Sequence, residues 1–181
     1  MHITEKKKYT EKDYQLLEEG APFQLINGDL VMSPSPSSYH QLLSARIFKI
    51  IDAFSEKINA DGLCLYAPLD VVLDEENIFQ TDLIYISGER KKELFHDRIM
   101  GAPDLIVEIL SPSTAYYDLQ QKKNFYERYG VKEYLIIDPK HFYAEAYVLR
   151  ENKFELQQKQ NDTINLNTLP GLQIDLQKLF S

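Results

Sequence analysis

The stretch Asp104-Leu-Ile-Val-Glu-Ile-Leu110 decides how this chain folds. Side chains alternate between the two faces of a strand, and both faces of this stretch are apolar apart from one residue. That pattern is typical of a central strand whose two faces are both covered. The exception is Glu108. A carboxylate in such a place must be ion-paired, hydrogen-bonded or metal-bound, or have its pKa raised.

Turn signals and apolar periodicity predict the elements on both sides of this strand. Asn27-Gly28 lies between two apolar runs and predicts a hairpin over residues 23–32. Residues 39–58 carry apolar side chains at helical spacing, and residues 114–129 form a second strong helix that ends at Gly130. We expect further strands at 63–73, 82–87 and 133–138, shorter helices at 10–18 and 89–97, and a C-terminal hairpin at 144–150 and 153–159.

This order of elements predicts an α/β (α+β) fold in which helices flank a mixed central sheet. The length of 181 residues fits a single domain over residues 1–181, with its core at about 14–150. One cysteine, Cys64, excludes an intramolecular disulfide and a cysteine-based zinc site. We find no apolar run long enough to cross a bilayer and no secretory signal pattern, so we expect a cytoplasmic protein with no membrane partner.

A second charge lies where the pattern calls for an apolar residue. At about 100° per residue, Lys122 falls near the centre of the apolar stripe of helix 114–129, and Lys123 falls on its flank. An ammonium in that position needs an acidic partner. The strand that carries Glu108 directly precedes this helix, so the two residues can meet. A purely structural ion pair, or a lysine that extends to solvent, explains the position equally well.

Asp82 opens the strand 82–87, and taken alone it is more simply explained as an aspartate that caps a turn. Together with Glu108 and Lys122 it is more specific. Two carboxylates can hold a hard cation such as Mg²⁺, which polarises a phosphate and lowers the pKa of a bound water. A lysine nearby can orient that water or offset charge in the transition state. The set predicts metal-assisted phosphodiester hydrolysis, and a hydrolase of another bond that uses Asp82 and Glu108 as an acid/base pair is the less favoured alternative.

Several segments resemble the Uma-type putative restriction endonuclease family, a former family of unknown function within the PD-(D/E)XK nuclease superfamily. The segments are Gln80-Thr-Asp-Leu83, Gly101 to Thr114, Lys122, Tyr126-Glu-Arg128, Gly130-Val-Lys-Glu-Tyr134 and Ile137-Asp-Pro139. The resemblance runs from about residue 14 to 150 and is most specific over 101–139. It implies a restriction-endonuclease-like fold and an endonuclease dependent on Mg²⁺ or Mn²⁺, with nucleic acid as substrate and DNA as the first expectation.

The resemblance also implies roles for individual residues. Asp82 and Glu108 match the two acids of the motif, and the carbonyl of Ile109 is a further metal ligand. The superfamily places its lysine two residues after the second acid, where this chain has Leu110, and Lys122 on the next helix takes that role. His40 matches a histidine often seen after the family's Ser-Pro turn, although a lone histidine on an apolar helix face is more often a core or cap residue. Candidate nucleic-acid contacts are Lys123 and Arg128.

Two departures from the family pattern bear on activity. Thr81 stands where the family has proline, which changes no ligand. Gln24 stands where the N-terminal hairpin usually has glutamate, so it cannot assist the site as an anion. The alternative function is therefore a catalytically impaired nuclease fold that serves as a binding or interaction module. A homodimer that pairs through the edge hairpin 144–159 is a further candidate.

The charge balance limits the kind of nucleic-acid binding that is expected. The chain has 20 Lys+Arg against 28 Asp+Glu, a net charge of −8, which argues against a general phosphate clamp. Basic residues gather in two groups near the helices of the site, namely Arg90, Lys91, Lys92 and Arg98, and Lys122, Lys123, Arg128 and Lys132. We expect a local basic rim around an acidic pocket, with weak, metal-dependent and salt-sensitive DNA binding.

Overall fold

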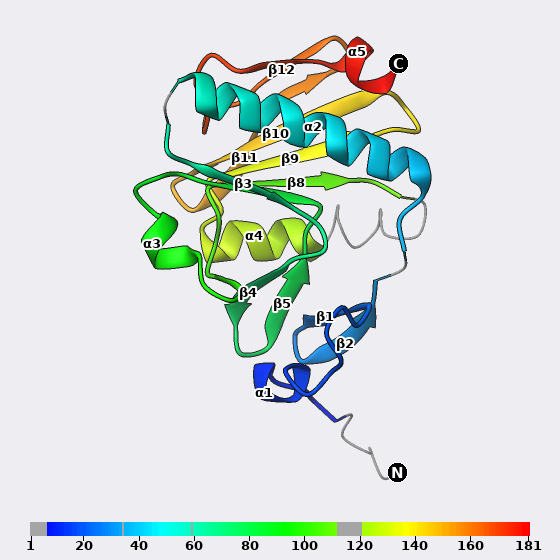
Figure 1. Ribbon diagram of the computed structural model, residues 1–181, viewed down its shortest axis with the longest axis vertical. Coiled ribbons are helices and arrows are strands. Elements are labelled where there is room, and N and C mark those ends of the chain that lie inside the picture. Colours follow the sequence, from blue (N-terminus) through cyan, green and yellow to red (C-terminus); the bar gives the residue numbers. More distant parts are fainter. Residues whose placement is uncertain (1–6, 34, 59, 112–120) are drawn as a thin grey trace.

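The larger of two mixed sheets forms the centre of the computed structural model, which describes residues 7–33, 35–58, 60–111 and 121–181 (Figure 1). Its strand order is β11-β10-β9-β8-β6-β3. The central strand β8 (Leu105–Ile109) pairs in parallel with β9 (Glu133–Asp138) and antiparallel with β6 (Leu83–Ile86). The outer strands are β3 (Leu63–Tyr66), β10 (Tyr143–Arg150) and β11 (Lys153–Gln160). The mixed central sheet and the C-terminal hairpin are therefore confirmed.

Two helices cover opposite faces of this sheet, α2 (Ser38–Lys57) and α4 (Lys123–Tyr129) (Figure 1). Leu105, Val107 and Ile109 pack in the core cluster that contains the buried residues of α2. The alternate residues Ile106 and Leu110 pack in the cluster that contains Phe125 and Tyr126 of α4. The central strand is buried on both faces, as its sequence predicts. Residues 114–120 of the expected helix 114–129 lie outside the described residues.

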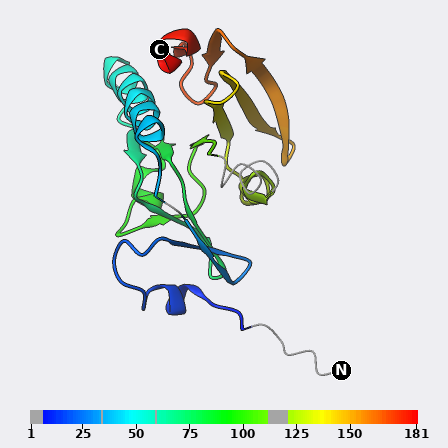
Figure 2. The same cartoon turned by 90° about the vertical axis from the view of Figure 1, so that its right-hand side faces the viewer.

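A smaller sheet carries the N-terminal hairpin, in the order β2-β1-β5-β4-β7. Its strands are β1 (Phe23–Ile26), β2 (Asp29–Met32), β4 (Asp70–Asp74), β5 (Asn77–Gln80) and β7 (Ile99–Met100). Figure 2 shows the β1–β2 hairpin and α1 (Glu11–Tyr14) at the opposite end of the molecule from α5 (Leu176–Phe180). The Asn27-Gly28 turn is confirmed, with φ values of 49° and 71°.

The fold corrects several sequence expectations. The helix expected over residues 10–18 is reduced to the single turn of α1. Residues 63–73 form no single strand, because the chain leaves the larger sheet after β3 and enters the smaller one at β4. Pro68 lies in the break, where it removes a ladder donor. The expected helix 89–97 is reduced to one turn, α3 (Lys91–Leu94). Strand β5 was not expected, and neither was the two-stranded sheet of β12 (Thr163–Asn165) and β13 (Gln173–Asp175).

The crossing from the smaller to the larger sheet places the first candidate acid. Strand β5 ends at Gln80 and β6 begins at Leu83, so Thr81 and Asp82 form the link between the two sheets. Thr81 is fully buried in this link. Asp82 therefore lies where the two sheets meet, beside the end of β8. Among the described helices, none is both long enough and apolar enough to cross a membrane.

Candidate active site

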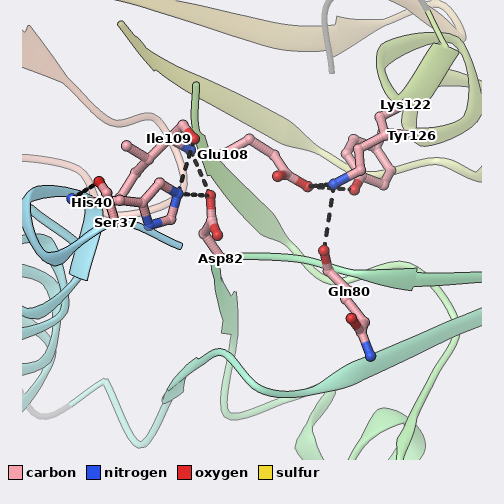
Figure 3. A network of polar contacts seen from close by, with 8 residues as sticks. All are labelled: Ser37, His40, Gln80, Asp82, Glu108, Ile109, Lys122 and Tyr126. Atoms are coloured by element: carbon pink, nitrogen blue, oxygen red, sulfur yellow. Dashed lines mark hydrogen bonds and ion pairs between the residues drawn. The ribbon is translucent and has the colours of Figure 1, made fainter. Parts of the chain in front are cut away.

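The first turn of α2 brings His40 to the end of the central strand. Ser37 caps this helix, because its hydroxyl accepts a hydrogen bond from the backbone N–H of His40 at 3.2 Å. The Nε2 atom of His40 lies 3.0 Å from the carbonyl oxygen of Ile109 and 3.2 Å from Oδ2 of Asp82 (Figure 3). A carbonyl oxygen only accepts hydrogen bonds, so Nε2 carries the hydrogen in this arrangement.

Asp82 binds the backbone of the same residue, Ile109. Its Oδ2 atom accepts a hydrogen bond from the backbone N–H of Ile109 at 2.7 Å (Figure 3). The carbonyl of Ile109 faces His40, while its N–H faces Asp82. One carboxylate, one imidazole and one main-chain carbonyl therefore meet at the carboxyl end of β8.

Glu108 and Lys122 form a buried ion pair beside this group. The Lys122 Nζ atom lies 2.8 Å from Oε1 of Glu108, with side-chain exposures of 5% and 3%. The hydroxyl of Tyr126 donates to the same oxygen at 2.8 Å, since Tyr126 lies one helical turn after Lys122 (Figure 3). The structure therefore joins the two charges that the sequence placed on apolar faces. Tyr126 was not among the site residues expected from the sequence.

Gln24 acts on the site through the backbone of β5. Its Oε1 atom accepts a hydrogen bond from the N–H of Gln80 at 3.1 Å, and Gln24 is 5% exposed. The carbonyl of Gln80 in turn accepts from Nζ of Lys122 at 3.4 Å. The hairpin residue thus supports the strand that contacts the lysine.

Lys123 and Arg128 lie on different sides of α4. The Nζ atom of Lys123 lies 3.6 Å from the centroid of the Tyr147 ring, and burial lowers the pKa of its ammonium against the attraction of Glu145. Arg128 is exposed, with its guanidinium over Tyr129. Neither contacts the Asp82–His40–Ile109 group through a described bond.

Much of the expected basic rim is engaged in structural ion pairs. Arg90 and Lys132 both bind the buried carboxylate of Asp104, at 3.2 and 2.6 Å. Lys91 binds Asp61, and the guanidinium of Arg98 lies 3.6 Å from Asp70. These cations are partly neutralised, which limits how much phosphate affinity they can supply.

The donor atoms at the end of β8 suit a small divalent cation. Neighbouring ligands of an octahedral cation with bonds of about 2.1 Å lie roughly 3.0 Å apart. Two distances match that spacing: His40 Nε2 lies 3.0 Å from the carbonyl oxygen of Ile109 and 3.2 Å from Oδ2 of Asp82. No cluster of three or more His, Cys, Asp or Glu side chains with metal-binding geometry occurs in the part of the chain that the structure describes. The main-chain carbonyl of Ile109 would therefore be an essential donor, and Glu108 would join the set only by leaving Lys122.

Comparison with known proteins places the chain in a family. The crystal structure of a protein described as a putative nuclease belonging to DUF820, from Anabaena variabilis, superposes with a TM-score of 0.78 at 18% identity. It covers 94% of this chain and 97% of that chain, which shows a shared fold. An uncharacterized protein of Synechocystis is 26% identical over 145 residues, 77% of each chain. The model of the Uma2 family, described as "Putative restriction endonuclease", matches residues 10–177. The chain belongs to this Uma2 family of putative restriction endonucleases.

Proposed function

We propose that this protein is a divalent-cation-dependent endonuclease that hydrolyses phosphodiester bonds of nucleic acid, with DNA as the first substrate to test. The observation that carries the proposal is the meeting of Asp82 and His40 at the backbone N–H and carbonyl of Ile109, next to the Glu108–Lys122 pair. Family membership supports the reaction class.

Asp82, the carbonyl of Ile109 and Glu108 would hold Mg²⁺ or Mn²⁺, and Nε2 of His40 would be a fourth donor once its hydrogen has moved to Nδ1. Such a cation polarises a phosphate and lowers the pKa of a bound water. Imidazole is a better ligand for transition metals than for Mg²⁺, so a histidine in the set favours Mn²⁺ over Mg²⁺. His40 also holds the carbonyl of Ile109 in place before any cation binds.

Lys122 would supply positive charge at the reacting phosphate. Without a cation, its ammonium is held by Glu108 and by the carbonyl of Gln80. When Glu108 turns to the cation, the carbonyl of Gln80 would still position the ammonium, which would then be available to the charge that develops on the phosphate oxygens. Tyr126 orients the Glu108 carboxylate through its hydroxyl. The role of Gln24 is to fix Gln80, which needs a hydrogen-bond acceptor and no negative charge.

The test is cleavage of labelled DNA by purified protein with MnCl₂ or MgCl₂. Wild type should cut and should stop on addition of EDTA, whereas Asp82→Ala and Glu108→Ala should not cut. Glu127→Ala is the matched control, because Glu127 is a carboxylate on α4 that bonds to Lys153 and to the N–H of Phe154 instead. Equal cutting by wild type and both site variants would contradict the proposal.

A nuclease fold without catalysis is the second candidate. Two observations favour it: a glutamine stands at position 24, and Glu108 is engaged by Lys122 and Tyr126 instead of facing Asp82. Calorimetric titration with Mn²⁺ separates the two functions. Absence of binding at millimolar Mn²⁺, with the fold intact by circular dichroism, would favour the binding module.

A further inference from the structure

Three aromatic residues form a partly exposed cluster at the end of the molecule that carries the candidate site. Phe142, in the turn between β9 and β10, is 56% exposed, and Tyr39, in the first turn of α2, is 37% exposed. Phe180 of α5 connects them. Its ring lies 5.7 Å from that of Phe142 at 81°, and its carbonyl accepts a hydrogen bond from the Tyr39 hydroxyl at 2.9 Å. We call Tyr39, Phe142 and Phe180 the aromatic cluster.

Two connections along the chain place this cluster next to the candidate site. Tyr39 directly precedes His40, whose ring contacts Ile109 and Asp82. Separately, Ile109 pairs with Ile137 across the parallel ladder of β8 and β9. Strand β9 ends one residue later, about 3.3 Å further along. The turn that carries Phe142 therefore begins beside the end of β8.

The turn that presents Phe142 is fixed by its own hydrogen bonds. Asp138 Oδ1 accepts from the backbone N–H groups of Lys140 and His141, and its Oδ2 lies 2.8 Å from Nδ1 of His141. Phe142 itself has φ of 55°, a left-handed conformation that costs about 1–3 kcal/mol for a bulky residue. A large apolar ring is thus held in a strained and exposed position. A glycine or a small polar residue there would cost less conformational free energy, so stability of the fold does not explain the phenylalanine.

The α5 side of the cluster is also held in place. Arg46 of α2 donates to the carbonyl oxygens of Leu179 and Ser181 at 2.7 and 2.6 Å. These bonds tie α5 to α2, and with them Phe180 to Tyr39. The aromatic rings are therefore presented by anchored elements.

We propose that the aromatic cluster stacks on unpaired bases of a nucleic-acid strand whose phosphate enters the Asp82–Ile109 site. The proposal rests on the proposed function and narrows its substrate to nucleic acid with single-stranded character. Bases inside a duplex hide their faces in the stack, whereas unpaired bases offer them to exposed aromatic rings. Lys140 lies in the same turn and is exposed, so its ammonium would be available to a phosphate of that strand.

The charge of the protein favours this mode of binding. The net charge is −8, and Arg90, Lys132 and Lys122 are held by Asp104 and Glu108. These ion pairs leave fewer cations of the basic rim for the many phosphate contacts that duplex binding uses. Stacking supplies affinity that does not depend on the number of neutralised phosphates.

The test compares single-stranded DNA with a duplex of the same sequence by fluorescence anisotropy, in EDTA so that no cleavage occurs. Phe142→Ala should weaken binding of a labelled oligonucleotide of about 16 nucleotides by about 5- to 100-fold, the range expected for one stacked base. Phe142→Trp should retain binding, because a ring remains. Phe95→Ala is the matched control, since Phe95 is 49% exposed and follows α3 on another part of the surface. Thermal melting confirms that each variant is folded.

Several results would overturn the proposal. They are an absence of single-strand binding by wild type, unchanged binding by Phe142→Ala, and an equal loss of binding to duplex and single strand. Sedimentation velocity tests whether a second copy of this chain covers the aromatic cluster instead of a nucleic-acid strand. A dimer that Phe142→Ala converts to a monomer with unchanged DNA binding would assign the cluster to self-association. Binding and cleavage are measured separately, so a wild type that binds single strands through Phe142 but does not cut them with Mn²⁺ would contradict the proposed function and leave the stacking proposal standing.

Discussion

The buried pair of Glu108 and Lys122 yields a quantitative prediction for stability. The two side chains are 3% and 5% exposed, and their charged atoms are 2.8 Å apart. Removal of one partner leaves the other charge in a poorly hydrated place without its nearest counter-charge, which costs about 3–5 kcal/mol. Loss of the carboxylate also removes the acceptor of the Tyr126 hydroxyl, which accounts for about 1 kcal/mol of that cost. Glu108→Leu should lower the free energy of unfolding by about 3–5 kcal/mol. Lys122→Met leaves the acceptor of Tyr126 in place and should cost about 1 kcal/mol less.

Urea unfolding followed by circular dichroism, in EDTA, measures these changes. The double variant Glu108→Leu/Lys122→Met should be more stable than either single variant, because no buried charge remains. The coupling energy of the cycle should therefore exceed about 3 kcal/mol, because the double variant costs less than either single variant alone. Lys153→Met is the matched control, since Lys153 forms a similar 2.8 Å pair with Glu127 but is 78% exposed, and it should cost less than about 1 kcal/mol. Single variants that each lose less than about 1 kcal/mol, with additive effects, would refute this reasoning.

Three further predictions concern pH, the hairpin and the histidine. Burial raises the pKa of the Asp104 carboxyl, but the ammonium of Lys132 and the other partners of Asp104 outweigh burial and lower that pKa below 3.8. The ionised Asp104 therefore stabilises the fold at pH values above 3.8, and this stabilisation is lost as the pH falls through the lowered pKa. The stability gap between wild type and Asp104→Asn in urea should therefore be wide at neutral pH and narrow in acid, and a gap independent of pH would contradict this. Gln24→Ala leaves the N–H of Gln80 unpaired and should lower the free energy of unfolding in urea by about 1–3 kcal/mol. Gln24→Glu keeps an acceptor and should lower it less, and the reverse order of the two variants would contradict the role assigned to Gln24. His40→Ala should weaken Mn²⁺ binding in calorimetry by about 10-fold or more, and an unchanged Kd would remove His40 from the metal site.

The elements that the sequence predicts well are those whose signals are local. The hairpin at Asn27-Gly28 follows from its turn residues, and β8 follows from apolar residues on both faces. The strand expected over residues 63–73 was wrong because nothing local tells which sheet each half joins. Strand β5 was missed because four residues carry little periodicity, and its place depends on pairing with β1 and β4.

The candidate site divides in the same way. A charge on an apolar face is visible in a sequence, so the meeting of Glu108 and Lys122 could be expected. The contact of His40 with the carbonyl of Ile109 joins residues 69 positions apart and depends on how α2 lies on the sheet. The bond from Tyr126 to Glu108 was hidden because a buried tyrosine counts as apolar while its hydroxyl still needs a partner.

The central claim is that Asp82 and the carbonyl of Ile109 bind a divalent cation at the end of β8. Anomalous diffraction from crystals soaked in MnCl₂ tests it most directly. The account predicts one manganese peak within roughly 2–2.5 Å of Asp82 and of the Ile109 carbonyl oxygen, with His40 or Glu108 in the same shell. Absence of that peak, in crystals of protein that cleaves DNA with Mn²⁺ in solution, would contradict the account.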